Sequence, residues 1–240
     1  MESETALNQL KTAKNPEELN DVLIDLGNNP KIRHLIVLDY ILDNFDQEKL
    51  SHIKLNLIYF IGELGLLTGI KDRYLLFLEN SYYESDRWIR NEIIQALNKI
   101  SRLTEINRLF GVITRGLFDE YEPIKINSLR CVLEIESLRS NEILAKILLN
   151  LRTENREIKD LIGDILKGSL NDESELFDLL NQAERYKGLN KHAFRNLLMV
   201  FFDSVVALES FRTKIQISNW QEDSKKQFLN EMKTYERILT

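Results

Sequence analysis

"SDRWIRNEIIQALNKI" occupies residues 85–100 and has the pattern of one amphipathic helix. Its apolar residues recur at offsets of 0, 4, 7, 8 and 11: Ile89, Ile93, Ala96, Leu97 and Ile100. These offsets mark one face of an α-helix. The polar residues around them raise three possibilities: a nucleic-acid reader, part of an active site, or one unit of a repeat. The rest of the chain favours the repeat.

The same pattern returns about every 35 residues. An apolar residue followed by a basic one opens it five times, at Ile53-Lys54, Ile89-Arg90, Ile124-Lys125, Ile158-Lys159 and Phe194-Arg195. The steps are 36, 35, 34 and 36 residues. If Cys131 is counted as apolar, the five offsets are apolar in every copy except at Ser128 and Ser169. A helical period therefore sits inside a longer period, which is typical of helical repeat proteins.

A second, shorter helical pattern lies between successive copies. It reads "KDRYLLFLENSY" (71–82), "TEINRLFGVITRGLF" (104–118), "NEILAKILLNL" (141–151) and "ESELFDLLNQAERY" (173–186). Each unit is therefore a helix pair, and one pair of this size cannot bury its own apolar face. The sequence predicts an all-α fold: a right-handed α-solenoid of about five antiparallel helix pairs.

Further helices are predicted at both ends. Residues 15–27 and 29–45 have helical patterns, and the prolines at 16, 30 and 123 stand where first helical positions are expected. A stripe of apolar residues predicts a terminal helix over 221–239, and we expect it to cover the apolar helix at 194–206. The predicted organisation is a single domain, 1–240, with an N-terminal helical cap (1–29), repeats (30–207) and a C-terminal capping helix (208–240).

The paired helices, with an apolar-basic pair at the head of each second helix, resemble HEAT repeats over residues 30–207. The resemblance implies an acidic residue six positions before the basic one, and a ladder of ion pairs between adjacent repeats. The matching positions are Glu48 and Lys54, Glu84 and Arg90, and Asp119 and Lys125. Thr153 and Leu189 stand at the acidic position of the last two units, so the ladder should be broken there. The spacing leaves no room for the third helix of armadillo-type units.

Composition narrows the function classes. The chain has 240 residues, 9 glycines, 3 prolines and a net charge of −6. A duplex-binding protein usually carries a basic surplus, so this balance argues against nucleic acid as the partner. A lone cysteine, Cys131, allows no intrachain disulfide. The most apolar run, residues 55–70, is shorter than a membrane span and contains Glu63. We expect a cytoplasmic protein with no membrane partner.

A candidate binding surface follows from the face opposite the core, which the HEAT resemblance implies is concave. Its residues mix amides, acids and apolar groups, a mixture that suits a polypeptide ligand. The predicted partner-binding residues are Tyr59, Trp88, Asn91, Gln95, Arg130 and Asp164. An ordinary solvated face with partial packing remains the alternative, and the Trp88 ring could equally lie against the loop of the next unit.

A basic cluster precedes the fifth unit. Arg185, Lys187, Lys191 and His192 could hold an acidic peptide segment or a phosphate. They could equally form a solvated loop whose charge is balanced by the acids at 172, 173, 175 and 178.

Signatures of catalysis are absent from the sequence. The histidines at 34, 52 and 192 have no metal-ligand spacing, and no nucleophile elbow or phosphate-binding glycine loop occurs. No metal or cofactor is therefore predicted, and we expect a non-catalytic scaffold or adaptor that binds another protein or a peptide segment. Some DNA alkylation-repair glycosylases and some bilin lyases are similar to HEAT solenoids. An enzyme of that kind, or a nucleic-acid adaptor acting through residues 185–195, remains the alternative.

Overall fold

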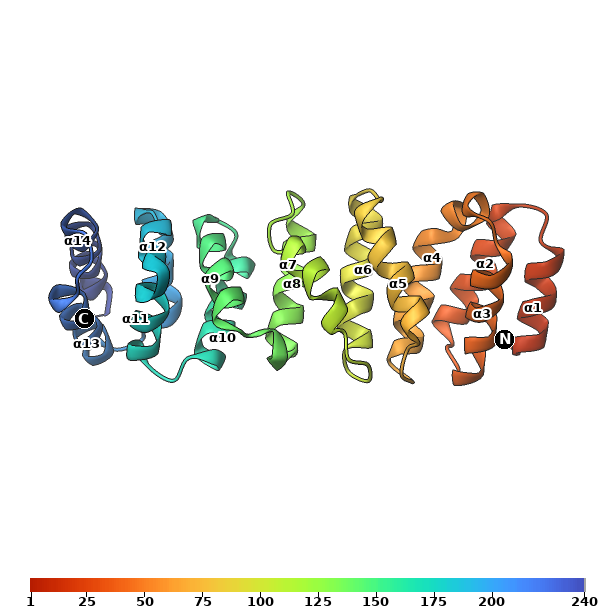
Figure 1. Ribbon diagram of the computed structural model, residues 1–240, viewed down its shortest axis with the longest axis horizontal. Helices are drawn as coiled ribbons and strands as arrows, with labels where there is room; N and C mark the ends of the chain where they lie inside the picture. Colours follow the sequence, from red (N-terminus) through yellow and green to blue (C-terminus); the bar gives the residue numbers. More distant parts are fainter. Residues whose placement is uncertain (240) are drawn as a thin grey trace. The chain divides into compact units, whose positions relative to one another are not determined.

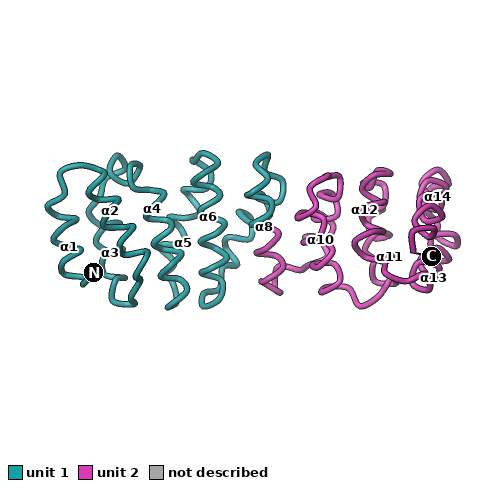
Figure 2. The backbone as a smooth tube through the Cα atoms, turned by 180° about the vertical axis from the view of Figure 1, so that it is seen from behind, with its two compact units in different colours: residues 1–127 teal, residues 128–240 magenta. Residues whose placement is uncertain are grey.

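The fold is entirely helical. A computed structural model describes residues 1–239, and these contain fourteen α-helices, five 3-10 segments and no β-strand. This confirms the predicted all-α class. The chain divides into two compact units, residues 1–127 and 128–240 (Figure 2). The single domain expected from the sequence stays a prediction.

The first unit is built from long helices that pack on one another and shorter helices beside them. The helices are α1 (Ser3–Thr12), α2 (Pro16–Asn28), α3 (Leu35–Asn44), α4 (Gln47–Gly65), α5 (Asp72–Tyr83), α6 (Arg87–Ile100), α7 (Phe110–Gly116) and the first half of α8 (Glu122–Glu134). Helix α4 packs between α2 and α6, while α5 and α7 pack against α6 (Figure 1). Two 3-10 segments, η1 (Ile32–His34) and η2 (Asn107–Leu109), precede α3 and α7.

The second unit has a similar packing arrangement and begins with the second half of α8. Its other helices are α9 (Asn141–Leu149), α10 (Arg156–Ser169), α11 (Glu173–Asn181), α12 (Lys191–Phe201), α13 (Val205–Ile217) and α14 (Glu222–Leu239). The 3-10 segments are η3 (Glu136–Leu138), η4 (Asn150–Arg152) and η5 (Gln182–Gly188). Helix α12 packs between α10 and α14, and α11 packs against α9 and α13.

Side-chain caps explain where many helices begin. Asp46, Asp86 and Asn190 each accept a hydrogen bond from a backbone N–H in the first turn of α4, α6 and α12. Pro16 occupies the first position of α2 behind its Asn15 cap, as predicted. The prediction for Pro30 was wrong, because η1 begins at Ile32 and α3 only at Leu35.

The sequence predicts twenty-five core positions, five in each of the five repeats, and twenty of them are buried. The five exceptions are half-buried: Ile89, Ile135, Ser169, Phe201 and Val205. Ile89 lies in the first turn of α6, where fewer neighbours surround it. Ile135 lies beyond α8, so the predicted helix extends one residue too far there.

The C-terminal region contains one more helix than the sequence predicted. Helix α12 ends at Phe201, and Ser204 caps a separate helix, α13, by accepting from the N–H of Ala207. The predicted helix over 194–206 was therefore wrong in its second half. Val205 belongs to α13 and not to the core face of α12.

The predicted terminal helix is present as α14, and it covers α12 as expected. The rings of Phe194 and Phe228 are stacked with centroids 4.2 Å apart. The Tyr235 hydroxyl donates to the Phe202 carbonyl at 2.7 Å. Arg195 and Glu231 form an ion pair at 2.8 Å beside them. The apolar flank of α12 is thus buried by aromatic contact and held by polar bonds.

Burial in α6 generates a stability prediction. Leu97 has no exposed surface, and Leu97→Ala should lower the free energy of unfolding by about 2–5 kcal/mol through lost burial and the cavity left behind. The matched control is Leu55→Ala on α4, where 43% of the residue is exposed and the loss should stay near 0.5 kcal/mol. Urea unfolding followed by circular dichroism measures both. Equal losses would contradict the assignment of buried and exposed faces.

Candidate functional site

The first turn of α6 carries an exposed aromatic residue in a fixed setting. Trp88 is 57% exposed, and its ring meets that of Tyr121 edge-on with centroids 5.7 Å apart. The guanidinium carbon of Arg87 lies 5.2 Å from both ring centroids, within cation–π range. Asp86 fixes the backbone by accepting from the N–H groups of Trp88 and Ile89. We call Arg87, Trp88 and Tyr121 the aromatic–arginine cluster.

Sequence reasoning identified Trp88 but missed the other two members, Arg87 and Tyr121. Tyr121 lies three residues before Ile124, and Arg87 lies two residues before Ile89, so both stand just ahead of a repeat's first core residue. That shared placement at the start of neighbouring second helices was the available signal. The Trp88 ring is held beside the next loop and is exposed as well, which combines the two alternatives considered for it.

Other predicted partner-binding residues of the first unit take part in helix packing. The Tyr59 hydroxyl donates to Asn28 Oδ1 at 3.3 Å, and Lys99 Nζ lies 5.2 Å from the centre of the Tyr59 ring. Asn91 Oδ1 accepts from the side-chain amide of Asn127 at 3.0 Å. These groups are thus already engaged across neighbouring helices. Gln95 is half-buried on α6.

The remaining predicted partner-binding residues, Arg130 and Asp164, lie in the second unit. Arg130, on the second half of α8, is exposed and forms an ion pair with Glu157 at 2.6 Å. Asp164 is exposed on α10. The structure therefore places Arg130 and Asp164 on the surface and gives Arg130 an acidic neighbour.

The predicted anion-binding cluster is locally neutralised. Lys187 pairs with Glu184 at 2.5 Å, Lys191 with Glu231 at 3.2 Å, and His192 with Glu154 at 3.0 Å. Arg185 donates to the Leu179 carbonyl and to the Gln182 side chain. These acidic partners differ from the four acids that the sequence suggested. The pairing leaves little surplus positive charge for an external anion.

The predicted ladder is present at one rung. Arg90 Nε and a second guanidinium nitrogen bond the two carboxylate oxygens of Asp119 at 3.0 and 3.1 Å, and this hydrogen bonding raises the pKa of Arg90. Among residues 1–239, no ion pair involves Glu48, Lys54, Glu84 or Lys125. Ion pairs 36 residues apart do occur elsewhere, between Glu63 and Lys99 and between Arg195 and Glu231.

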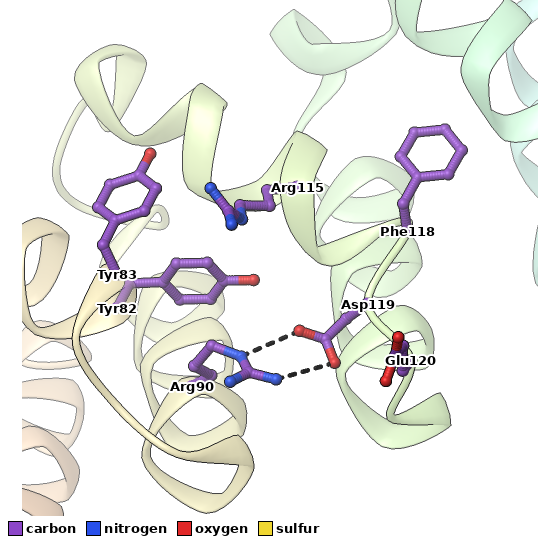
Figure 3. A pocket seen from close by; sticks show the side chains of 7 residues that line it. All are labelled: Tyr82, Tyr83, Arg90, Arg115, Phe118, Asp119 and Glu120. Carbon is purple, nitrogen blue, oxygen red and sulfur yellow. Dashed lines mark hydrogen bonds and ion pairs between the residues drawn. The ribbon is translucent and has the colours of Figure 1, made fainter.

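A hollow lies beside the Arg90–Asp119 rung (Figure 3). It has a volume of about 470 Å³. Its lining consists of Tyr82, Tyr83, Arg90, Arg115, Phe118, Asp119 and Glu120, from α5, α6, α7 and the loop before α8. We call it the tyrosine–arginine pocket. The sequence singled out only Arg90 and Asp119, because these two match the predicted ladder positions and the other lining residues match no repeated position.

Across residues 1–239, no three histidine, cysteine, aspartate or glutamate side chains are grouped so that they could hold a metal ion. Within the same range, no helix is both long and apolar enough to cross a bilayer.

Comparisons with known proteins give a likeness of fold. No protein-family model matches the sequence, and no curated protein matches it. The structure is similar to the crystal structure of an engineered protein, with a TM-score of 0.52 and 13% identity over 98% of each chain. At that identity the similarity concerns the fold alone.

Glu92 on α6 generates a pH prediction. Burial raises its pKa, the nearby Glu63 carboxylate raises it further, and Lys99 opposes the shift. Because the folded-state pKa exceeds the unfolded value, stability present at low pH is lost as the pH rises through the folded-state pKa. Glu92→Gln should therefore unfold at higher urea concentration than the wild type at pH 7.

The advantage of Glu92→Gln should vanish near pH 4, where the unfolded carboxyl group is also largely protonated. Urea midpoints at both pH values measure it. Glu48→Gln, an exposed glutamate in the first turn of α4, is the control. It loses a favourable charge at the helix N-terminus, so it should lower the free energy of unfolding at pH 7 by about 0.3–1 kcal/mol and not raise it. A lower midpoint for Glu92→Gln at pH 7 would contradict the assigned direction.

Proposed function

We propose that this protein is a non-catalytic scaffold that binds another polypeptide, built as a right-handed HEAT-like solenoid of about five helix pairs. The repeated packing of second helices within each unit supports the repeat architecture, with α4 between α2 and α6, and α12 between α10 and α14. Side-chain bonds one period apart support it further. Asn56 bonds Asn20, and Asn127 bonds Asn91, both across 36 residues.

The aromatic–arginine cluster is the observation that carries the binding proposal. Exposed tryptophan, tyrosine and arginine side chains are the types that dominate the energy of protein interfaces. Here Trp88 is 57% exposed, while the Asp86 cap and the Tyr121 ring restrict its motion. A side chain that is already ordered loses less conformational entropy when a partner binds. Trp88 would therefore be the main anchor, with Gln95 as an additional contact in the same unit. Arg130 would offer a separate contact on the second unit.

No specific observation favours the alternative functions. A duplex-binding groove needs unpaired cations, whereas Lys187, Lys191 and His192 lie next to carboxylates. The net charge of −6 points the same way. The glycosylase-like and lyase-like enzymes and the nucleic-acid adaptor therefore have less support than the polypeptide-binding scaffold.

A capture experiment tests the proposal. Immobilised wild-type protein and Trp88→Ala would be exposed to lysate of the native cells, and retained proteins would be identified and quantified by mass spectrometry. Hot-spot truncation costs about 2 kcal/mol or more, so Trp88→Ala should retain a specific partner at least tenfold less well. Its circular dichroism spectrum and urea midpoint should stay unchanged, because Trp88 is outside the core.

Leu103→Ala is the matched control, since Leu103 is an apolar residue with 53% exposure outside the cluster. It should retain the partner as well as the wild type does. Equal capture by Trp88→Ala and the wild type would contradict the role of the cluster.

A further inference from the structure

The tyrosine–arginine pocket has the size and lining of a binding site. Its volume of about 470 Å³ falls within the range of small-molecule and side-chain pockets, about 300–1,000 Å³. Aromatic and charged side chains converge on it from three helices and one loop (Figure 3). All of these residues belong to the first unit.

The Tyr82 hydroxyl is a buried donor in need of an acceptor. Tyr82 is only 1% exposed, and its hydroxyl has no hydrogen-bond partner among residues 1–239. In Figure 3 this hydroxyl points into the pocket, between Arg115 and the Arg90–Asp119 pair. A buried polar group without a partner costs about 1–3 kcal/mol. Burial, reinforced by the Asp119 carboxylate, raises the pKa of Tyr82 to about 12, so the group stays a donor at neutral pH.

Arg115 is the uncommitted cation of the pocket. Arg90 is already occupied, because it donates to both oxygens of Asp119 and to the Ser85 carbonyl. Arg115 forms no ion pair within residues 1–239, and its guanidinium lies 5.5 Å from the centre of the Tyr83 ring. In Figure 3, Arg115 and the Arg90–Asp119 pair flank the Tyr82 hydroxyl from opposite sides. One neutral donor and one cation thus face the same space.

These two groups match a singly charged acceptor. A carboxylate has two oxygens that can accept from a hydroxyl and a guanidinium together. A doubly charged phosphate is less suitable, because Asp119 and Glu120 also line the pocket and would repel the second charge. Tyr83 and Phe118 are about half exposed at the rim, where they offer apolar surface to the group that carries the carboxylate.

We propose that the tyrosine–arginine pocket binds a carboxylate of a partner polypeptide, with the Tyr82 hydroxyl and Arg115 as its donors. The polypeptide source rests on the proposed scaffold function. The pocket and the aromatic–arginine cluster share the loop before α8, since Phe118, Asp119 and Glu120 line the pocket and Tyr121 packs on Trp88. A peptide anchored at Trp88 could therefore extend along this loop to the pocket.

Direct titration of the full chain with four defined probes tests the pocket. The probes are acetyl-Ala-Glu-Ala-amide, acetyl-Ala-Gln-Ala-amide, acetyl-Ala-Gln-Ala with a free carboxyl terminus, and inorganic phosphate. Tyrosine rings labelled with ¹³C are followed by NMR, and Tyr82→Phe identifies the Tyr82 signal. The first or third probe should shift that signal, which distinguishes a side-chain carboxylate from a C-terminal one. Equal shifts with the neutral probe, or tighter binding of phosphate, would overturn the proposal.

Variants separate binding from folding. Tyr82→Phe and Arg115→Gln should each weaken binding of the effective probe at least tenfold, while the controls Tyr40→Phe and Arg102→Gln, outside the pocket, should leave it unchanged. Tyr82→Phe should also keep or raise the urea midpoint without probe, because it removes a hydroxyl that no protein group satisfies. Unchanged affinity, or a lowered midpoint, would assign Tyr82 a structural role and overturn the proposal.

The outcome is distinguishable from failure of the scaffold proposal. Loss of partner capture in Trp88→Ala together with no probe binding would overturn the pocket alone. Probe binding together with full capture by Trp88→Ala would overturn the anchor role of Trp88 and leave the carboxylate site in place.

Discussion

The structure depends on one constraint: each helix has an apolar face that only a neighbouring helix can bury. Helix α4 illustrates it, because its contact with α6 is close enough to involve the backbone. A Cβ atom on Gly62 would lie 3.0 Å from Ala96 Cα, and one on Gly65 would lie 3.0 Å from Ile100 Cα. Glycine at these two positions lets the helices approach, and the flanking apolar residues then fill the interface.

Polar bonds at the edges of these interfaces fix which residues meet. The Arg90–Asp119, Glu63–Lys99 and Arg195–Glu231 pairs each join residues 29 to 36 positions apart. The carboxylates of Asp119 and Glu231 are largely buried in these pairs, so loss of either arginine would leave a buried charge without its partner. The geometry of the pairs also holds the loops and helix starts where side chains such as Trp88 are presented. Both candidate sites, the aromatic–arginine cluster and the tyrosine–arginine pocket, therefore lie where helix packing brings a loop and its aromatic and charged side chains to the surface.

The helical class and most of the buried positions were predictable because burial is periodic and periodicity is visible in sequence. All five core positions of the unit that begins at Ile53 are buried as expected, and so are four of the five in the unit that begins at Ile158. The errors fall where chain ends and caps compete with the pattern, as at Ser204, which starts a new helix inside the predicted one. The sites were less predictable. The pocket residues Tyr82 and Arg115 follow no shared period, and only the folded chain brings them together.

Hydrogen exchange at the α4–α6 interface tests the central constraint most directly. Gly65→Val would add atoms where the backbones of α4 and α6 approach, so neither helix could keep its partner's apolar face covered. Amides of both α4 and α6 should lose protection together, while α10 and α12 of the second unit keep theirs. Loss confined to the residues around position 65, with α6 as protected as in the wild type, would show that the helices are stable without mutual burial.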